Sequence, residues 1–126
     1  MIKKLELNFG TIKIYEDNLL VSELKEGILF DVESNRQLLT IGTEAFKGKP
    51  YAYISNRINS YAVNPMVYRE SADYQNLKAI AVVTNCPYGQ KSAQVEQKFY
   101  KYKNSFEIFK TFEEAKSWVK RALYSY

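Results

Sequence analysis

Two polar stretches of this chain follow apolar runs and carry side chains able to bind other groups. Residues 53–65 read YISNRINSYAVNP, and residues 84–89 read TNCPYG. Arginine offers a fixed fork of donors to a carboxylate or phosphate, serine and asparagine form hydrogen bonds, and tyrosine rings pack against partners. The candidate binding residues are Ser55, Asn56, Arg57, Ser60, Tyr61, Asn85 and Tyr88. They could hold a phosphate, a carboxylate or a loop of a partner protein, and a purely local role for serine and asparagine in turns and caps also stays open.

The residue types argue against catalysis. The chain has no histidine and one cysteine, Cys86, so the commonest base near neutral pH and the ordinary zinc sites are missing. A reactive thiol would need a neighbouring base, which the sequence around Cys86 does not offer. Four acids lie close in the sequence, where a strand end and a helix start would favour solvated carboxylates: Glu23, Glu26, Asp31 and Glu33. We therefore expect no catalytic residue, no metal site and no cofactor, and predict that the protein is not an enzyme.

Size and composition fit one domain covering residues 1–126. The chain is 46% hydrophobic and 25% charged, which is typical of a globular protein with a single core. Its net charge of +4 is spread along the sequence except for a denser stretch over residues 98–121, where Glu107, Glu113 and Glu114 stand among the cations. Because nucleic-acid binders usually gather cations on one face, nucleic acid is not the partner that we expect.

The sequence also carries expectations about location. The chain opens MIKKLELNF, without the apolar segment of a secretion signal, and a single cysteine cannot form an intramolecular disulfide. No apolar run approaches the roughly 18 residues that a membrane helix needs. We expect a cytoplasmic protein without a transmembrane segment.

The elements that position the polar stretches follow from the hydrophobic pattern. Apolar and polar residues alternate from Leu5 to Phe9 and again from Ile12 to Ile14, and residues 19–24 form a third apolar run. This pattern predicts three consecutive antiparallel strands. Residues 51–54 and the continuous apolar run at 78–84 predict two strands inside the sheet, and residues 106–109 an edge strand paired on one side.

Capping signals and helical spacing predict the helices. Asp31 is a suitable N-cap, Gly48 a suitable end, and Thr111 with Glu114 forms a capping box. The expected helices cover residues 32–47, 65–74 and 92–102, with a last helix from about residue 112. Together the elements predict an α/β fold with a mixed central sheet, antiparallel N-terminal strands and about four helices. If the strands at 51–54 and 78–84 are parallel, both polar stretches emerge at the same edge of the sheet.

This order of elements resembles the STAS-like superfamily of sulfate-transporter and anti-sigma-factor-antagonist domains, in its small stand-alone bacterial branch. The most characteristic part is FEIFKTFEEA at residues 106–115, followed by Trp118 and Val119. It is similar to the short strand, capped turn and Trp-containing helix that close many such proteins. The resemblance covers nearly the whole chain and implies a regulatory protein-interaction module. In the antagonist proteins a serine after a central strand is phosphorylated, and Ser55 occupies the matching place.

Two functional hypotheses follow. The first is a non-enzymatic STAS-like domain that binds a protein partner, or a second copy of itself as a homodimer, through residues 55–61 and 85–88. The second is a carrier of a lipid or another small anionic ligand, with Arg57 against the anionic head and tyrosine rings along the body.

Overall fold

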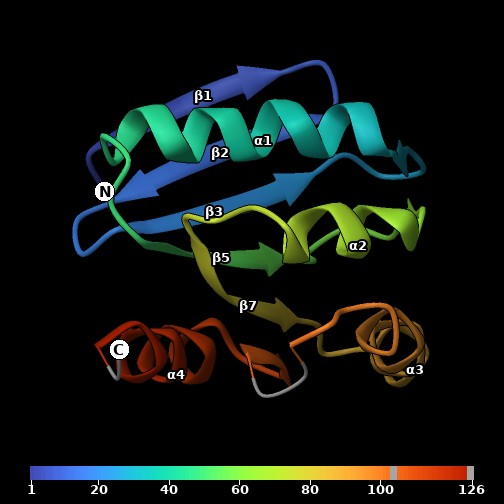
Figure 1. Ribbon diagram of the computed structural model, residues 1–126. Helices are drawn as coiled ribbons and strands as arrows, with labels where there is room; N and C mark the ends of the chain where they lie inside the picture. The colour runs from blue at the N-terminus through green and yellow to red at the C-terminus, as the bar shows by residue number, and fades with distance from the viewer. Residues whose placement is uncertain (103–104, 125–126) are drawn as a thin grey trace.

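The computed structural model describes residues 1–102 and 105–124 and shows an α/β fold with a mixed sheet and helices packed against it (Figure 1). The elements, in chain order, are β1 (Lys3–Leu7), β2 (Gly10–Tyr15), β3 (Leu19–Leu24), β4 (Leu29–Phe30), α1 (Val32–Ala45), β5 (Tyr51–Asn56), β6 (Ala62–Val63), α2 (Met66–Ala72), β7 (Leu77–Val83), α3 (Pro87–Gln97), β8 (Phe106–Phe109) and α4 (Phe112–Tyr124). The predicted fold class is confirmed.

The main sheet has six strands in the order β1-β2-β3-β5-β7-β8. β1, β2 and β3 form an antiparallel meander, whereas β5, β7 and β8 continue parallel to β3. The predicted central position of β5 and β7 is therefore confirmed. So is the edge strand β8, which pairs with β7 alone within the described part of the chain. β4 and β6 form a second, separate sheet of two parallel strands, which the sequence did not predict.

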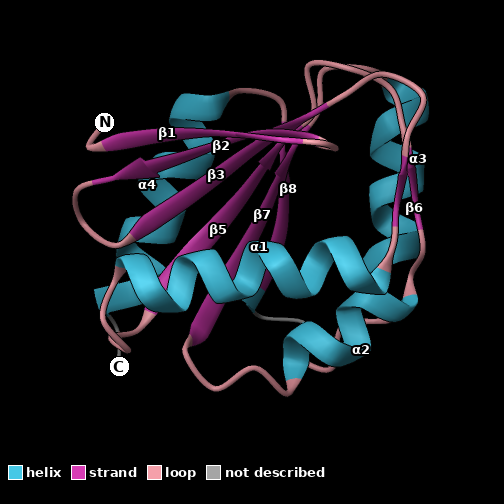
Figure 2. Ribbon diagram, turned by 90° about the horizontal axis from the view of Figure 1, so that it is seen from above, coloured by secondary structure: helices cyan, strands magenta, loops and turns pink. Residues whose placement is uncertain are grey.

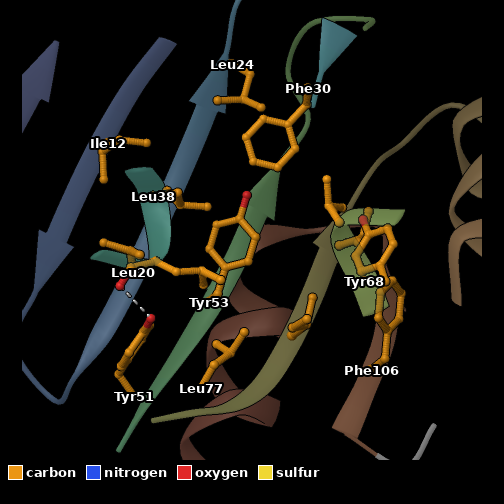
Figure 3. Packing of buried hydrophobic residues seen from close by; sticks show 14 of the residues in the cluster. Ile12, Leu20, Leu24, Phe30, Leu38, Tyr51, Tyr53, Tyr68, Leu77 and Phe106 are labelled. Atoms are coloured by element: carbon orange, nitrogen blue, oxygen red, sulfur yellow. Dashed lines mark hydrogen bonds between the residues drawn. The ribbon is translucent and has the colours of Figure 1, made fainter. Parts of the chain in front are cut away.

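The two faces of the sheet are covered differently. Figure 2 shows α1 and α2 on one side of the sheet and α4 on the other. On the first side, Ile12, Leu20 and Tyr53 are buried in the larger core together with Leu38 of α1 (Figure 3). The smaller core lies under α4 and is made mostly of short side chains such as Ala79 and Ala81. Both sheet faces are thus buried at β5 and β7, which explains their continuous apolar sequences.

Local signals set most helix ends. The Asp31 carboxylate accepts a hydrogen bond from the Ser34 backbone N–H at 2.9 Å and starts α1 at the predicted residue. At α4, the Thr111 hydroxyl accepts from the Glu114 backbone N–H at 3.2 Å and donates to the Glu114 side chain at 3.0 Å, so the capping box is confirmed. No helix within the described residues has both the length and the apolar character needed to cross a membrane.

The predicted bounds of two elements are wrong, and both corrections concern the polar stretches. α3 covers Pro87–Gln97 rather than residues 92–102. It begins earlier because proline is well suited to a first helical turn, and Phe99 and Tyr102 lie in the segment after it. Gly89 then fits against Thr84, where a Cβ atom would lie 2.4 Å from the Thr84 hydroxyl oxygen. β5 runs on to Asn56, so Ser55 and Asn56 belong to the strand instead of the loop that follows it.

Candidate functional site

The predicted site residues gather where β5 and β7 end. Two grooves lie side by side there, and Arg57, Ile58, Thr84 and Cys86 line both. The first groove has a volume of about 320 Å³ and also includes Ser60, Tyr61 and Tyr88. The second has a volume of about 460 Å³ and includes Asn56, Asn85 and Phe112. We call this surface the carboxyl edge. Six of the seven predicted residues line it, and Ser55 lies beneath it.

Arg57 faces inward and forms a two-point ion pair with Glu96 of α3. Its Nη1 donates to Glu96 Oε2 at 2.8 Å, and its Nη2 donates to Glu96 Oε1 at 2.6 Å. The two side chains are only 10% and 9% exposed. The guanidinium charge is therefore compensated within the protein, and most of its donors are already used.

Three hydroxyl groups complete the surroundings of this pair. Tyr68 donates to Glu96 Oε1 at 2.6 Å and accepts from Arg57 Nη2 at 3.2 Å. Ser55 Oγ accepts from Arg57 Nε at 3.2 Å, and the hydroxyls of Ser55 and Tyr61 share a hydrogen bond of 2.9 Å. The Arg57 guanidinium also lies 5.5 Å from the centre of the Tyr61 ring, a cation–π distance. We call Ser55, Arg57, Tyr61, Tyr68 and Glu96 the Arg57–Glu96 cluster.

The cluster joins three separate parts of the chain. Ser55, Arg57 and Tyr61 come from β5 and the loop after it, Tyr68 from α2, and Glu96 from α3. Among the described residues, no buried side-chain nitrogen or oxygen lacks a hydrogen-bond partner. A fully paired polar group of this kind fixes how the helices sit on the sheet.

Burial shapes the proton affinities in the cluster. It raises the pKa of Tyr68 well above its ordinary value, and the Glu96 carboxylate adds to this while Arg57 opposes it. Burial also raises the pKa of Tyr61, against the opposing charge of Arg57. Burial alone would lower the pKa of Arg57, but the hydrogen bonds to Glu96 and the neighbouring tyrosines outweigh it, and this pKa is raised as well. The arginine therefore stays charged and the tyrosines neutral at physiological pH.

Ser55 is buried, and its hydroxyl contacts Arg57 and Tyr61. Its phosphorylation stays a prediction. A kinase could reach this hydroxyl only after the loop from Arg57 to Tyr61 moved away, because Ser55 Oγ lies under that loop.

The other predicted residues are divided between the strand end and the surface. Asn56 donates to Glu23 at 3.0 Å and is thereby held against β3. The Ser60 backbone N–H donates to Glu26 at 2.8 Å, which fixes the loop after β5. Asn85 and Tyr88 are exposed at the start of α3. The structure thus brings the two polar stretches to one edge of the sheet. Within that edge, Ser55 and the side chain of Arg57 are largely buried, whereas Asn85 and Tyr88 are exposed.

Sequence reasoning missed Tyr68, Glu96 and Ile58. The position of Glu96 can be inferred once the helix is known to begin at Pro87, because Gly89, Ala93 and Glu96 then share one helix face. Gly89 and Ala93 are small residues that pack closely, so an acid on the same face pointed to a buried cation. Tyr68 and Ile58 gave no comparable signal.

Potential metal ligands and the single cysteine are also relevant at this edge. In the part of the chain that the structure describes, no three acidic, cysteine or histidine side chains lie close enough to hold a metal ion. Cys86 is exposed at the N-cap of α3, and its backbone N–H donates to the Thr84 hydroxyl at 3.4 Å.

Comparison with known proteins gave no further guide, since no family model, curated protein or solved structure matches this chain. The functional argument therefore depends on the geometry of the carboxyl edge.

Proposed function

We propose that this protein is a non-enzymatic interaction domain whose carboxyl edge binds a protein partner or a second copy of the chain. The observation that carries the proposal is the exposure of two large side chains on the rim of the first groove: Ile58 is 66% and Tyr88 is 77% exposed. Isolated exposed apolar residues are common, but here an aliphatic and an aromatic side chain flank one hollow. An aromatic anchor beside a groove is a usual feature of binding hot spots.

The Arg57–Glu96 pair favours a protein over an anionic small ligand. In the carrier hypothesis, Arg57 binds the ligand's anionic head. Here Glu96 already occupies the guanidinium with bonds of 2.8 and 2.6 Å. A ligand carboxylate or phosphate would have to displace Glu96 and leave that carboxylate buried without its cation, which is costly. A partner that packs against Ile58 and Tyr88 needs no such displacement.

The same proposal agrees with the STAS-like resemblance, which implies a regulatory interaction module in the bacterial cytoplasm. In this proposal the buried cluster supports the edge from below. It holds α3, and with it Tyr88, against the strand that leads to Ile58.

Site-specific photo-crosslinking tests the proposal. A photoreactive phenylalanine analogue would replace Tyr88 at the edge or, as the matched control, Tyr124 on α4, which is also a highly exposed tyrosine at 70%. We expect a discrete crosslinked product from position 88 in cells of the source and none from position 124. Ile58→Asp in the position-88 variant should abolish the product, since a charge would enter the contact. Native mass spectrometry then distinguishes a homodimer from another partner.

Two results would overturn the proposal. One is an equal yield of products from positions 88 and 124, which would indicate nonspecific contact. The other is a product from position 88 that Ile58→Asp leaves unchanged, because the groove would then not be the contact surface.

A further inference from the structure

A second pair of grooves lies at the opposite end of the parallel strands. One groove, of about 600 Å³, is lined by residues that lead into β7 and by the segment after α3, among them Tyr74, Leu77 and Tyr102. The adjoining groove, of about 570 Å³, is lined by Arg69, Lys98, Phe99 and Lys101. Ala72 and Asp73, at the end of α2, line both. Leu77 begins β7, whereas the carboxyl edge follows Val83, so the two sites are separate. We call the second one the basic groove.

The net charge of the protein is concentrated at this place. Four of the chain's 18 basic residues line the basic groove with one of its 14 acidic residues: Arg69, Lys78, Lys98 and Lys101 with Asp73. The remainder of the chain is nearly neutral. Within residues 1–102 and 105–124, no ion pair engages Arg69, Lys98 or Lys101. Their charges are available to an anion, unlike the charge of Arg57.

The glutamates that argued against a nucleic-acid partner do not line this groove. Glu107 follows the first residue of β8, and Glu113 and Glu114 lie in the first turn of α4. None of the three is among the lining residues. Lys98 and Lys101 therefore line the basic groove without these glutamates, although all five residues belong to the same charged stretch of the sequence.

Aromatic rings accompany these cations. Tyr102 is about half exposed, and Lys101 Nζ lies 5.5 Å from the centre of its ring. Phe99 and Tyr74 are partly buried and line the adjoining walls. Cations beside rings are the combination that binds a nucleotide, because the phosphate meets a lysine or arginine and the base stacks on a ring. An acidic peptide would use the cations and leave the rings without a role.

We propose that the basic groove binds nucleotides, either free or as part of a single-stranded nucleic acid. Lys98, Lys101 and Arg69 contact the phosphate groups, and Tyr102 stacks on a base once the flexible Lys101 side chain turns from the ring to the phosphate. This function is independent of the carboxyl edge.

Fluorescence anisotropy with a short fluorescein-labelled oligothymidylate tests the proposal over a range of salt concentrations. The Lys98→Ala, Lys101→Ala double variant should bind more weakly. The slope of log affinity against log salt should fall by about 1.4, because each phosphate contact to a single strand contributes about 0.7. The matched control is Lys3→Ala, Lys25→Ala, which removes the same charge from two exposed lysines outside the groove and should bind as the native protein does.

A third variant and three competitors test the role of the ring and the source of the ligand. Tyr102→Leu should weaken oligonucleotide binding about tenfold through lost stacking, with inorganic triphosphate binding unchanged. Displacement of the probe by ATP supports a free nucleotide, and displacement by unlabelled oligothymidylate alone supports a strand. The proposal is wrong if the native protein binds neither ATP nor oligothymidylate, or if the two lysine double variants bind the probe equally. It is also wrong if polyglutamate displaces the probe as well as unlabelled oligothymidylate does.

Discussion

Two arginine–glutamate pairs in this protein have nearly the same geometry and very different surroundings. Arg57 and Glu96 are joined at 2.8 and 2.6 Å, and Arg36 and Glu70 at 2.7 and 3.1 Å. The first pair links a loop after β5 to α3 and is about one-tenth exposed. The second links α1 to α2, and the Arg36 side chain is 62% exposed.

The comparison teaches that geometry alone does not give an ion pair its role. At the surface, water competes for both partners, and the attraction is largely screened. In the interior, each charge depends on the other, because water cannot replace a missing partner. The Arg57–Glu96 pair is thus a structural constraint on α3, whose buried residues are otherwise limited to Ala93. The Arg36–Glu70 pair is an addition to two helices that the buried Asn35 side chain of α1 already joins, through hydrogen bonds to the Ser71 hydroxyl and the Val67 carbonyl of α2.

The largest expected effect comes from breaking the buried pair. Arg57→Ala leaves Glu96 buried without its cation and should lower the free energy of unfolding by about 3–5 kcal/mol, as measured by urea denaturation. Arg57→Lys should restore only part of this, because an ammonium group cannot reproduce the two parallel bonds. A loss below about 1 kcal/mol for Arg57→Ala would mean that the pair is solvated, as surface pairs are.

A smaller effect concerns alkaline pH. Burial raises the pKa of Tyr51, Tyr53, Tyr61 and Tyr68 in the folded state, so the unfolded chain loses these protons first. Their stabilising contribution is complete below the unfolded pKa of about 10 and is lost as pH rises above it, by up to about 1.4 kcal/mol per pH unit for each tyrosine. Urea denaturation between pH 9 and 11 measures the slope.

The cluster itself can be separated from the other tyrosines in that experiment. The Tyr61→Phe, Tyr68→Phe variant should show a shallower alkaline loss than the native protein. The Arg36→Ala variant should show the native slope, since no tyrosine in the Arg36–Glu70 pair titrates. An equal slope in all three proteins would argue against buried tyrosines as the cause.

The smallest effect is expected at the exposed pair. Arg36→Ala should shift the urea midpoint only slightly, and the shift should vanish in high salt, because screening already weakens a surface pair. A midpoint shift as large as that of Arg57→Ala would contradict the distinction between the two pairs.

The sequence predicted the fold where the determinants are local. The alternation in β1 to β3, the Asp31 cap and the Thr111 capping box each act within a few residues, and the structure confirms all of them. The start of α3 was wrong because Pro87 and Gly89 are also typical of loops. Only the close contact of Gly89 with Thr84 shows why a glycine stands in that helix.

The site was predicted in position but not in organisation. The ends of two parallel strands brought the polar stretches together as expected. The pairing of Arg57 with Glu96 spans 39 residues, so no local pattern could show that the guanidinium faces inward. The basic groove was missed for the same reason. Arg69 lies in the last turn of α2 and Lys98 at the end of α3, so they line one groove only because the fold brings the two helix ends together.

The most direct test of the account replaces the buried pair by apolar residues and measures both stability and binding. In the Arg57→Met, Tyr68→Phe, Glu96→Leu triple variant, no charge is left unpaired and the Tyr68 hydroxyl, which bonds to both partners, is removed with them, so stability should recover most of what Arg57→Ala loses. If the cluster only supports the carboxyl edge, photo-crosslinking from position 88 should persist in this variant. Recovered stability with crosslinking lost would contradict the account and make Arg57 itself a binding group.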